Sequence, residues 1–214
     1  MKDIQIIYEN DEIIIINKSA GMSVQGGEKI AHPLDKELPI LLGYPIYLVH
    51  RLDKDTSGLM IVSKTPQSAS KWTKLIGEKS VQKEYDAICI GHPKKTSGVI
   101  TENIIEKGIS KTALTNFKVL KTISLTTETN EIIELSLLHL TLGTGRMHQI
   151  RIHLAHENLP IAGDDKHGNF KLNKVVRKLV GIKRLMLNAS RLTLPDGQVF
   201  EIPLPTDMQG VVEK

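Results

Sequence analysis

Residues 47–64 read YLVHRLDKDTSGLMIVSK, which places a charged segment, 50–58, directly before a continuous apolar run. The run at 58–64 predicts a strand that is buried on both faces, because a half-exposed strand would alternate apolar and polar residues. Charges at the rim of a core are costly unless they are paired or functional. The charged segment is therefore a candidate site, and the alternative is a polar turn whose Asp, Thr and Ser side chains cap the backbone.

Short apolar runs on both sides of this segment predict a strand-rich chain. The runs 4–8 and 12–18 indicate a hairpin, and Pro-Asp-Gly at 195–197 indicates another between 184–194 and 198–204. Strands that cluster in hairpins predict an α+β fold, with flanking helices on a mostly antiparallel mixed sheet. The other expected strands are 47–50, 83–91, 99–105, 112–122 and 131–143. Three helices are expected: one that begins at Pro66, a second at 147–157 and a third at 170–179.

Composition bounds the class of protein. The chain has 214 residues, of which 40% are hydrophobic and 24% charged, and it shows no internal repeat or linker. We therefore expect one globular domain, 1–214. The net charge is +4, but residues 163–191 contain eight Lys and Arg against two Asp. That local charge of +6 favours a polyanionic partner, although a solvated helix face would explain it equally well.

Targeting and redox signals are weak. Cys89 is the single cysteine and lies in an apolar run, so we expect a buried, inert thiol. Acidic residues stand too early for a signal peptide, and no run approaches the roughly 18 apolar residues of a membrane span. We expect a cytoplasmic protein that does not associate with membranes.

Two further segments carry candidate chemistry. In LGTGRMHQIRIH, at 142–153, two glycines make a tight turn before a helix, and the first N–H groups of a helix suit an anion. In KEYD, at 83–86, the ring of Tyr85 can stack on a nucleobase. The alternatives are an ordinary surface helix and a half-buried strand aromatic.

Several other functions lack their motifs. Segment 50–58 begins like a kinase catalytic loop but lacks its Asn, and no G-x-G-x-x-G loop precedes it. No Walker ending and no G-x-S-x-G elbow occurs. His148, His153 and His156 break helical register and no H-E-x-x-H is present, so we predict no metal site. No cofactor motif is found either.

The three segments together resemble the signature motifs of the RluA family of pseudouridine synthases. HRLDxxTSG lies at 50–58, KxY at 83–85 and GRxHQxRxH at 145–153. The resemblance runs from about residue 8 to about residue 205. Shorter matches agree with it: NKxAG at 17–21, PIxGD at 160–164 and LxA at 187–189.

The resemblance implies a role for each matching residue. Asp53 corresponds to the essential catalytic aspartate, and Tyr85 to the tyrosine that stacks on the target base. Arg151 corresponds to the arginine that pairs with the aspartate. Leu187 corresponds to the residue that closes the pocket under the base, and Arg51 to one that fills the vacated stack.

The third motif also supplies Arg146 and His148, which we expect to bind the substrate. The chain departs from the family pattern at Ser19, Gln25 and Asn188, where the family usually has Pro, His and His. These positions affect loop stiffness and the surroundings of the pocket, so they bear on substrate detail.

The function that the resemblance implies is isomerisation of specific uridines to pseudouridine through a flipped-out nucleotide, without metal or cofactor. Segments 163–170 and 183–189 look most like members that act on large-subunit ribosomal RNA, while tRNA is the alternative substrate. A catalytically inactive RNA-binding assembly factor is the alternative function, against which Asp53, Tyr85 and Arg151 argue. We expect a monomer without the RNA-binding domain that precedes the catalytic domain in many relatives.

Overall fold

The computed structural model describes residues 4–27 and 30–214, and the chain divides into two compact units. The first unit comprises Met1–Lys83 and Ala189–Ile202, and the second comprises Glu84–Asn188 and Pro203–Lys214. The boundaries at 83/84 and 188/189 fall inside two strands, and each unit combines two stretches that are distant in the sequence. No helix in the described ranges is long and apolar enough to cross a membrane.

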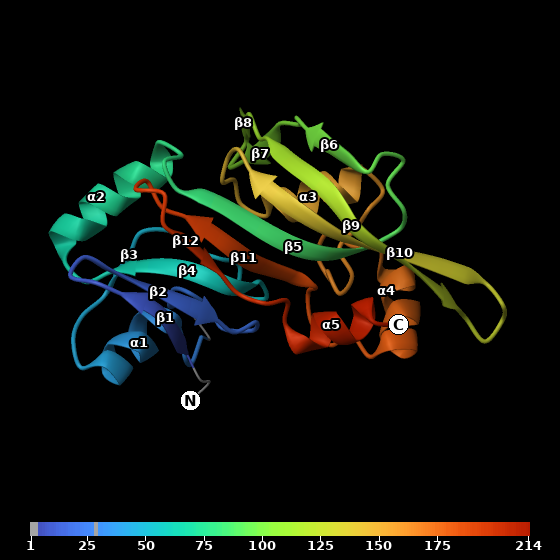
Figure 1. Cartoon of the computed structure of the whole chain (residues 1–214), viewed down its shortest axis with the longest axis horizontal. Coiled ribbons are helices and arrows are strands. Elements are labelled where there is room, and N and C mark those ends of the chain that lie inside the picture. The colour runs from blue at the N-terminus through green and yellow to red at the C-terminus, as the bar shows by residue number, and fades with distance from the viewer. Residues whose placement is uncertain (1–3, 28–29) are drawn as a thin grey trace. The chain divides into compact units, whose positions relative to one another are not determined.

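Hairpins build the sheet of the first unit (Figure 1). β2 pairs antiparallel with β1 on one side and β4 on the other, and β4 also pairs with β3. β11 is the next strand beside β4, and β12 pairs with β11. The strands are β1 (Gln5–Glu9), β2 (Ile13–Lys18), β3 (Tyr47–Leu48), β4 (Ser57–Ser63), β11 (Leu187–Thr193) and β12 (Val199–Glu201).

The first unit has two helices with different sequence signals. α2 (Pro66–Gly77) begins as predicted, with Pro66 in its first turn and a capping box between Thr65 and Ser68. α1 (Leu34–Leu42) was not predicted, because Pro39 inside it reads as a helix breaker. Leu34 and Leu38, one turn apart, are both buried. Burial of this apolar stripe therefore outweighs the backbone hydrogen bond that Pro39 removes.

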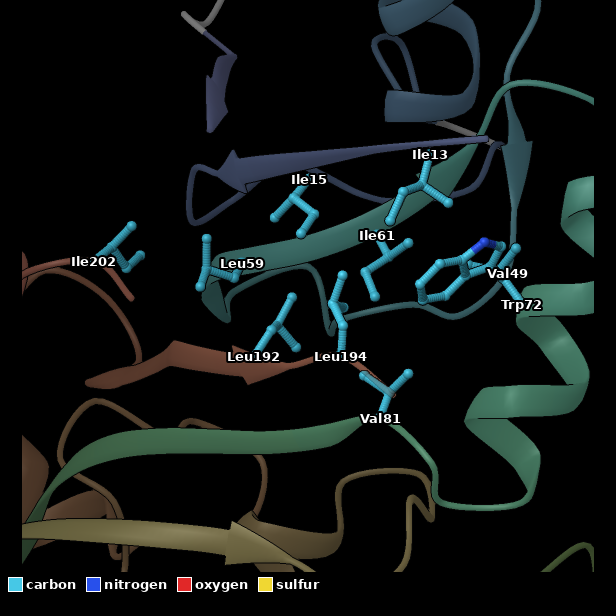
Figure 2. Packing of buried hydrophobic residues seen from close by; sticks show 10 residues of the cluster. All are labelled: Ile13, Ile15, Val49, Leu59, Ile61, Trp72, Val81, Leu192, Leu194 and Ile202. Atoms are coloured by element: carbon cyan, nitrogen blue, oxygen red, sulfur yellow. The ribbon is translucent and has the colours of Figure 1, made fainter. Parts of the chain in front are cut away.

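The core of the first unit lies between its sheet and α2 (Figure 2). Every residue of β4 is buried, which confirms the prediction that this strand is covered on both faces. Trp72 closes one end of the cluster, and its indole N–H donates to Glu12 Oε2 at 3.0 Å. The figure shows Ile13, Ile15, Val49, Leu59, Ile61, Trp72, Val81, Leu192, Leu194 and Ile202.

The strands of the second unit pair antiparallel in the order β5-β10-β9-β6. β7 and β8 form a separate hairpin. The strands are β5 (Gln82–Ile90), β6 (Ser97–Ile100), β7 (Ile104–Glu106), β8 (Ile109–Lys111), β9 (Thr115–Thr126) and β10 (Ile132–Leu142). The helices are α3 (Gln149–His156), α4 (Phe170–Val180) and α5 (Thr206–Val212).

The expected α+β class is confirmed, but some element bounds were wrong. The expected strand 99–105 is two strands, because polar residues at 101–103 interrupt it. The expected strand 112–122 begins later, at Thr115 in β9, and the short strand β8 before it was not predicted. Lys107 and Gly108, both with positive φ, make the turn between β7 and β8. α5 was missed, since it is short and contains a glycine. That residues 1–214 act as one catalytic domain stays a prediction.

Candidate active site

The charged segment 50–58 is a turn that leads from β3 into β4 of the first unit. The N–H of Thr56 donates to the carbonyl oxygen of Asp53 at 3.2 Å. Leu52 and Thr56 are buried, Asp53 is half-buried and Arg51 is exposed. The turn therefore holds the Asp53 carboxyl group at the edge of the core, where the sequence predicted it.

Lys18, at the end of β2, ties this turn to the sheet. The side chain is fully buried, and its ammonium donates to the carbonyl oxygens of Ser19, Met22 and Lys54 at 3.0, 3.0 and 3.1 Å. The N–H of Gly21 also donates to Lys54, at 2.8 Å. A buried ammonium is tolerated only when its hydrogens are bonded. The sequence predicted no role for Lys18, although a lysine two positions after four consecutive isoleucines was the available signal.

His50 begins the charged segment and is a structural acceptor. Its Nε2 accepts a hydrogen bond from the N–H of Ile61 at 3.0 Å, which requires the neutral ring. Loss of solvation, together with the nearby charge of Lys83, lowers the pKa of His50 to about 3. His50 is therefore neutral at physiological pH and holds the turn against β4.

Gly58 shows why the motif ends in glycine. Its φ is +111°, a conformation that other residues rarely adopt, and it opens β4 beside β11. A Cβ atom at this position would lie 2.2 Å from the carbonyl oxygen of Ala189. The two backbones approach so closely that no side chain fits.

Tyr85 is a buried residue of β5 in the second unit. Its neighbours Glu84 and Asp86 point to the opposite face of the strand, because successive side chains alternate. There they contact both ring nitrogens of His139, at 2.7 and 2.8 Å. The hydrogen bond to Asp86 raises the pKa of His139, burial opposes the shift, and Glu84 adds to it. These contacts of His139 were not predicted from the sequence, since His139 lies 53 positions from Asp86.

Gln149 organises the loop that precedes α3. The amide is buried, and its Nε2 donates to the Leu114 carbonyl at 2.8 Å and to Thr115 Oγ1 at 3.0 Å. Its Oε1 accepts from Thr144 Oγ1 at 2.7 Å and from the N–H of Arg146 at 3.0 Å. The side chain therefore uses both ends to join the glycine-containing turn to β9.

Two contacts orient the loop residues before α3. The Nε of half-buried Arg146 donates to the carbonyl of Thr112 at 3.2 Å, and the N–H of Met147 donates to Glu106 Oε1 at 2.7 Å. The carboxylate of Glu106 thus already accepts one of the N–H groups just before α3, where the sequence predicted an anion site. The expected substrate-binding role of Arg146 stays a prediction.

His148 stands in the left-handed region, with φ +56°, immediately before α3. Its Nδ1 lies 2.8 Å from Nε2 of His167, and the two rings meet edge to face with centroids 5.0 Å apart. One ring must donate and the other accept, so at least one of the two is uncharged at that bond. His148 therefore contacts a residue of the loop before α4, and its expected role in substrate binding stays a prediction.

Arg151, in α3, is buried and forms a two-pronged ion pair with Asp164. Nε donates to Oδ2 at 2.8 Å, and Nη2 donates to Oδ1 at 2.7 Å. The N–H groups of Lys166 and His167 also donate to Oδ1, both at 2.9 Å. Burial raises the pKa of Asp164, but these hydrogen bonds, of which the one from Arg151 is the strongest, lower it by more than burial raises it. The net shift of the pKa is downward. The motifs predicted Asp53 as the partner of Arg151, whereas the pair with Asp164 was not predicted.

The predicted site residues fall into both units. Leu187 is buried at the start of β11, as is the variant position Asn188, whereas Gln25 is exposed. The pairing of Asp53 with Arg151 stays a prediction. The first unit contributes Arg51 and Asp53, and the second contributes Tyr85, Arg146, His148, Arg151 and Leu187.

The basic helix α4 is partly neutralised. Arg177 pairs with Asp165 at 2.7 Å, and Lys178 pairs with Glu128 at 3.0 Å. Lys174 is exposed and has no carboxylate partner within the part of the chain that the structure describes. The positive charge that remains available to an anion is therefore smaller than the sequence suggested.

A groove of about 570 Å³ lies in the second unit, between the end of β5, the start of β10 and the start of α4. None of the predicted site residues lines it, and His167 is its link to His148. Within residues 4–27 and 30–214, no group of three His, Cys, Asp or Glu side chains is arranged to hold a metal ion.

Comparison with known proteins shows which family the chain resembles over most of its length. Residues 12–156 match the family model described as RNA pseudouridylate synthase. The ribosomal large subunit pseudouridine synthase C of Rickettsia bellii is 40% identical over 181 residues, which are 78% of this chain and 58% of that protein. The chain thus spans less than two thirds of that relative. The protein of the same name from Salmonella typhi is 33% identical over 95% of this chain and 67% of its own length. Human RNA pseudouridylate synthase domain containing 4 superposes with a TM-score of 0.78, at 26% identity, over 98% of this chain and 92% of that one.

Proposed function

Because the chain belongs to the RNA pseudouridylate synthase family, we propose that it converts uridine to pseudouridine in RNA. The proposed substrate is large-subunit ribosomal RNA, since the relatives from Rickettsia bellii and Salmonella typhi are named for that substrate. The observation that carries the proposal is that the matched range 12–156 contains Asp53, Tyr85 and Arg151.

The proposed reaction is an isomerisation. The bond between C1′ of the ribose and N1 of uracil breaks, the base turns, and C1′ joins C5, from which a proton is lost as N1 gains one. The reacting atoms are inaccessible in a stacked helix, so the nucleotide must be extruded at a cost of a few kcal/mol. Stacking on Tyr85 can return ~1–3 kcal/mol of that cost.

In this mechanism the carboxylate of Asp53 attacks C1′ or removes a proton from C2′. Either role needs the ionised form, which burial disfavours and a neighbouring cation favours. We propose Arg151 as that cation. Lys18 and His50 fix the backbone of the turn that carries Asp53, which supports this role.

The proposal is tested by Asp53→Asn in an assay that releases tritium from C5-labelled uridine in ribosomal RNA. We expect folded protein that binds RNA without measurable turnover, because removal of a catalytic nucleophile costs on the order of 10⁶ in kcat. Asp55→Asn, at an exposed carboxylate of the same turn, is the matched control and should stay near wild type. Retention of a tenth of wild-type activity by Asp53→Asn would reject this role.

The modified position is found by mapping pseudouridines in total RNA with and without the protein. Loss of sites in large-subunit ribosomal RNA supports the proposed substrate, whereas loss confined to tRNA replaces it. The monomeric state and the cytoplasmic location expected from the sequence stay predictions.

A further inference from the structure

The carboxylate of Asp164 is more firmly held than an ordinary partner in an ion pair. Its side chain is 1% exposed, and it accepts two hydrogen bonds from the Arg151 guanidinium and two from backbone N–H groups. A carboxylate has about four acceptor sites, so these four donors saturate it. The position of the Asp164 carboxylate is therefore fixed, and with it the side of the Arg151 guanidinium that it binds.

The backbone around Asp164 is fixed as well. Asn173 of α4 accepts from the N–H of Gly163 at 2.9 Å and donates to the carbonyl of Asp164 at 2.8 Å. A Cβ atom at Gly163 would lie 2.0 Å from the carbonyl oxygen of Arg184, and one at Gly168 would lie 2.2 Å from that of Asp164. The turn thus has two glycine positions without room for a side chain and an amide that joins it to α4.

We propose that Asp164 is a positioning residue for the reaction, which sets the orientation of the Arg151 guanidinium. The inference rests on the proposed function. Asp164 binds the edge of the guanidinium formed by Nε and Nη2. A guanidinium is planar and carries five N–H donors, so one carboxylate on this edge leaves the Nη1–Nη2 end to present two donors to another anion.

The orientation matters because the second anion in the proposed mechanism is catalytic. A flexible arginine would neutralise a carboxylate from many directions, whereas one locked by Asp164 has a single direction to offer. Misplacement of a catalytic group by about 1 Å can cost on the order of 100-fold in rate. Asp164 would therefore act through Arg151 on kcat, without touching the RNA.

The test is Asp164→Asn in the full chain, with kcat and KM measured on ribosomal RNA. The amide fits the same volume but places an NH2 group against one of the guanidinium donors. We expect kcat to fall about 100-fold while KM changes by less than about threefold, because the group lost does not bind substrate. An unchanged kcat would overturn the proposal.

A matched control separates positioning from a general loss of ion pairing. Asp207 also makes a two-pronged pair with an arginine, Arg184, at 2.6 and 2.8 Å in the same unit. Asp207→Asn should leave kcat unchanged. An equal loss of kcat in both variants would show a structural effect and overturn the proposal.

The pH profile separates positioning from a purely electrostatic role. If Asp164 only moderated the charge of Arg151, its neutralisation would shift the acid limb of the pH profile of kcat. Positioning instead predicts that Asp164→Asn lowers kcat by the same factor at every pH. A shifted limb with an unchanged plateau would overturn the proposal.

A measurement on the wild type does not depend on folding of the variant. The Nε–H of Arg151, identified as the NMR signal that Arg151→Lys removes, should exchange slowly with water because it is bonded to a buried carboxylate. Exchange as fast as in an exposed arginine would overturn the proposal. The wild type and Asp53→Asn, measured in the same assay, keep the two ideas apart. A wild type without turnover rejects the proposed function, and an active Asp53→Asn rejects the catalytic role of Asp53. An active wild type and an inactive Asp53→Asn beside a fully active Asp164→Asn reject positioning alone.

Discussion

The two units hold their candidate residues by different means. In the first unit, Lys18 donates only to main-chain carbonyls in the contacts that hold the turn, and His50 accepts from a main-chain N–H as a neutral ring. In the second unit, Arg151 and His139 are held by carboxylates. The first arrangement depends on backbone geometry, and the second on which side chains are charged.

The difference indicates how each unit should respond to perturbation. Main-chain carbonyls do not titrate, so the structure of the turn that carries Asp53 should depend more on steric fit than on the charge of its neighbours. Ion pairs fail when one partner is neutralised, because the other is left as an uncompensated charge in the interior. We therefore expect the first unit to be most sensitive to substitutions that add side-chain volume, and the second to substitutions that remove or reverse a charge.

The largest expected effect is Gly58→Ala in the first unit. The new Cβ would lie 2.2 Å from the Ala189 carbonyl oxygen, at a φ of +111°. Backbone strain and overpacking together should lower the free energy of unfolding by about 3 kcal/mol or more. Urea denaturation measures this change.

The matched control is Gly77→Ala, at the end of α2, where a Cβ atom would meet nothing within 4 Å. It should change the free energy of unfolding by less than about 1 kcal/mol, in the stabilising direction. If Gly58→Ala is as mild as this control, close backbone approach does not hold the turn.

A smaller effect is expected from charge reversal on α4 of the second unit. Lys174→Glu should weaken RNA binding about tenfold at low salt and flatten its salt dependence, because one phosphate contact is lost and a repulsion is added. Lys178→Glu should do less, since Lys178 already pairs with Glu128. Filter binding at several salt concentrations measures both.

Lys36→Glu serves as the control, on α1 of the first unit, where the side chain is exposed. It should leave the salt dependence as in the wild type. An unchanged slope for Lys174→Glu would mean that α4 is a solvated face and not part of the RNA-binding surface.

The smallest effects are expected from the two histidines, and they have opposite signs. The pKa of His50 is lowered from 6.5 to about 3, so below pH 6.5 the unfolded chain binds a proton that the folded chain does not, and stability falls on acidification. The pKa of His139 is raised from 6.5, so its stabilisation is full below that value and is lost as pH rises through the raised pKa.

Urea midpoints at pH 5, 7 and 9 test both signs. His50→Gln should reduce the loss of stability between pH 7 and pH 5, because glutamine can accept from Ile61 without titrating. His139→Gln should reduce the loss between pH 7 and pH 9. If both variants keep the wild-type pH dependence, neither ring is held as the structure indicates.

Local signals in the sequence predicted much of the fold. The buried strand β4, the hairpin at 195–197 and the start of α2 were all readable from apolar runs and turn residues. The sequence did not show α1, because Pro39 is a breaker locally, and burial of Leu34 and Leu38 decides the outcome only in the folded state. The break between β6 and β7 was missed although its signal is local, since residues 101–103 between the two strands are polar.

The candidate site divides in the same way. Asp53, Tyr85 and Arg151 lie on a turn, a strand and a helix, as their motifs predicted. They could be found from the sequence because each belongs to a short motif of contiguous residues. The partners that hold them, Lys18 for the turn and Asp164 for the arginine, were visible as residues but not as partners.

By itself, the sequence determined the class of fold, the three motifs and the family to which they belong, because periodicity and spacing are local properties of the chain. Only the tertiary structure decided which groups neutralise the buried charges. An arginine at 151 can pair with any carboxylate that the fold brings near. Asp164 is brought there by a turn that Asn173 bonds to α4 and that has no room for a side chain at Gly163 or Gly168. Pairing across the fold depends on distances in space, which spacing along the chain does not fix.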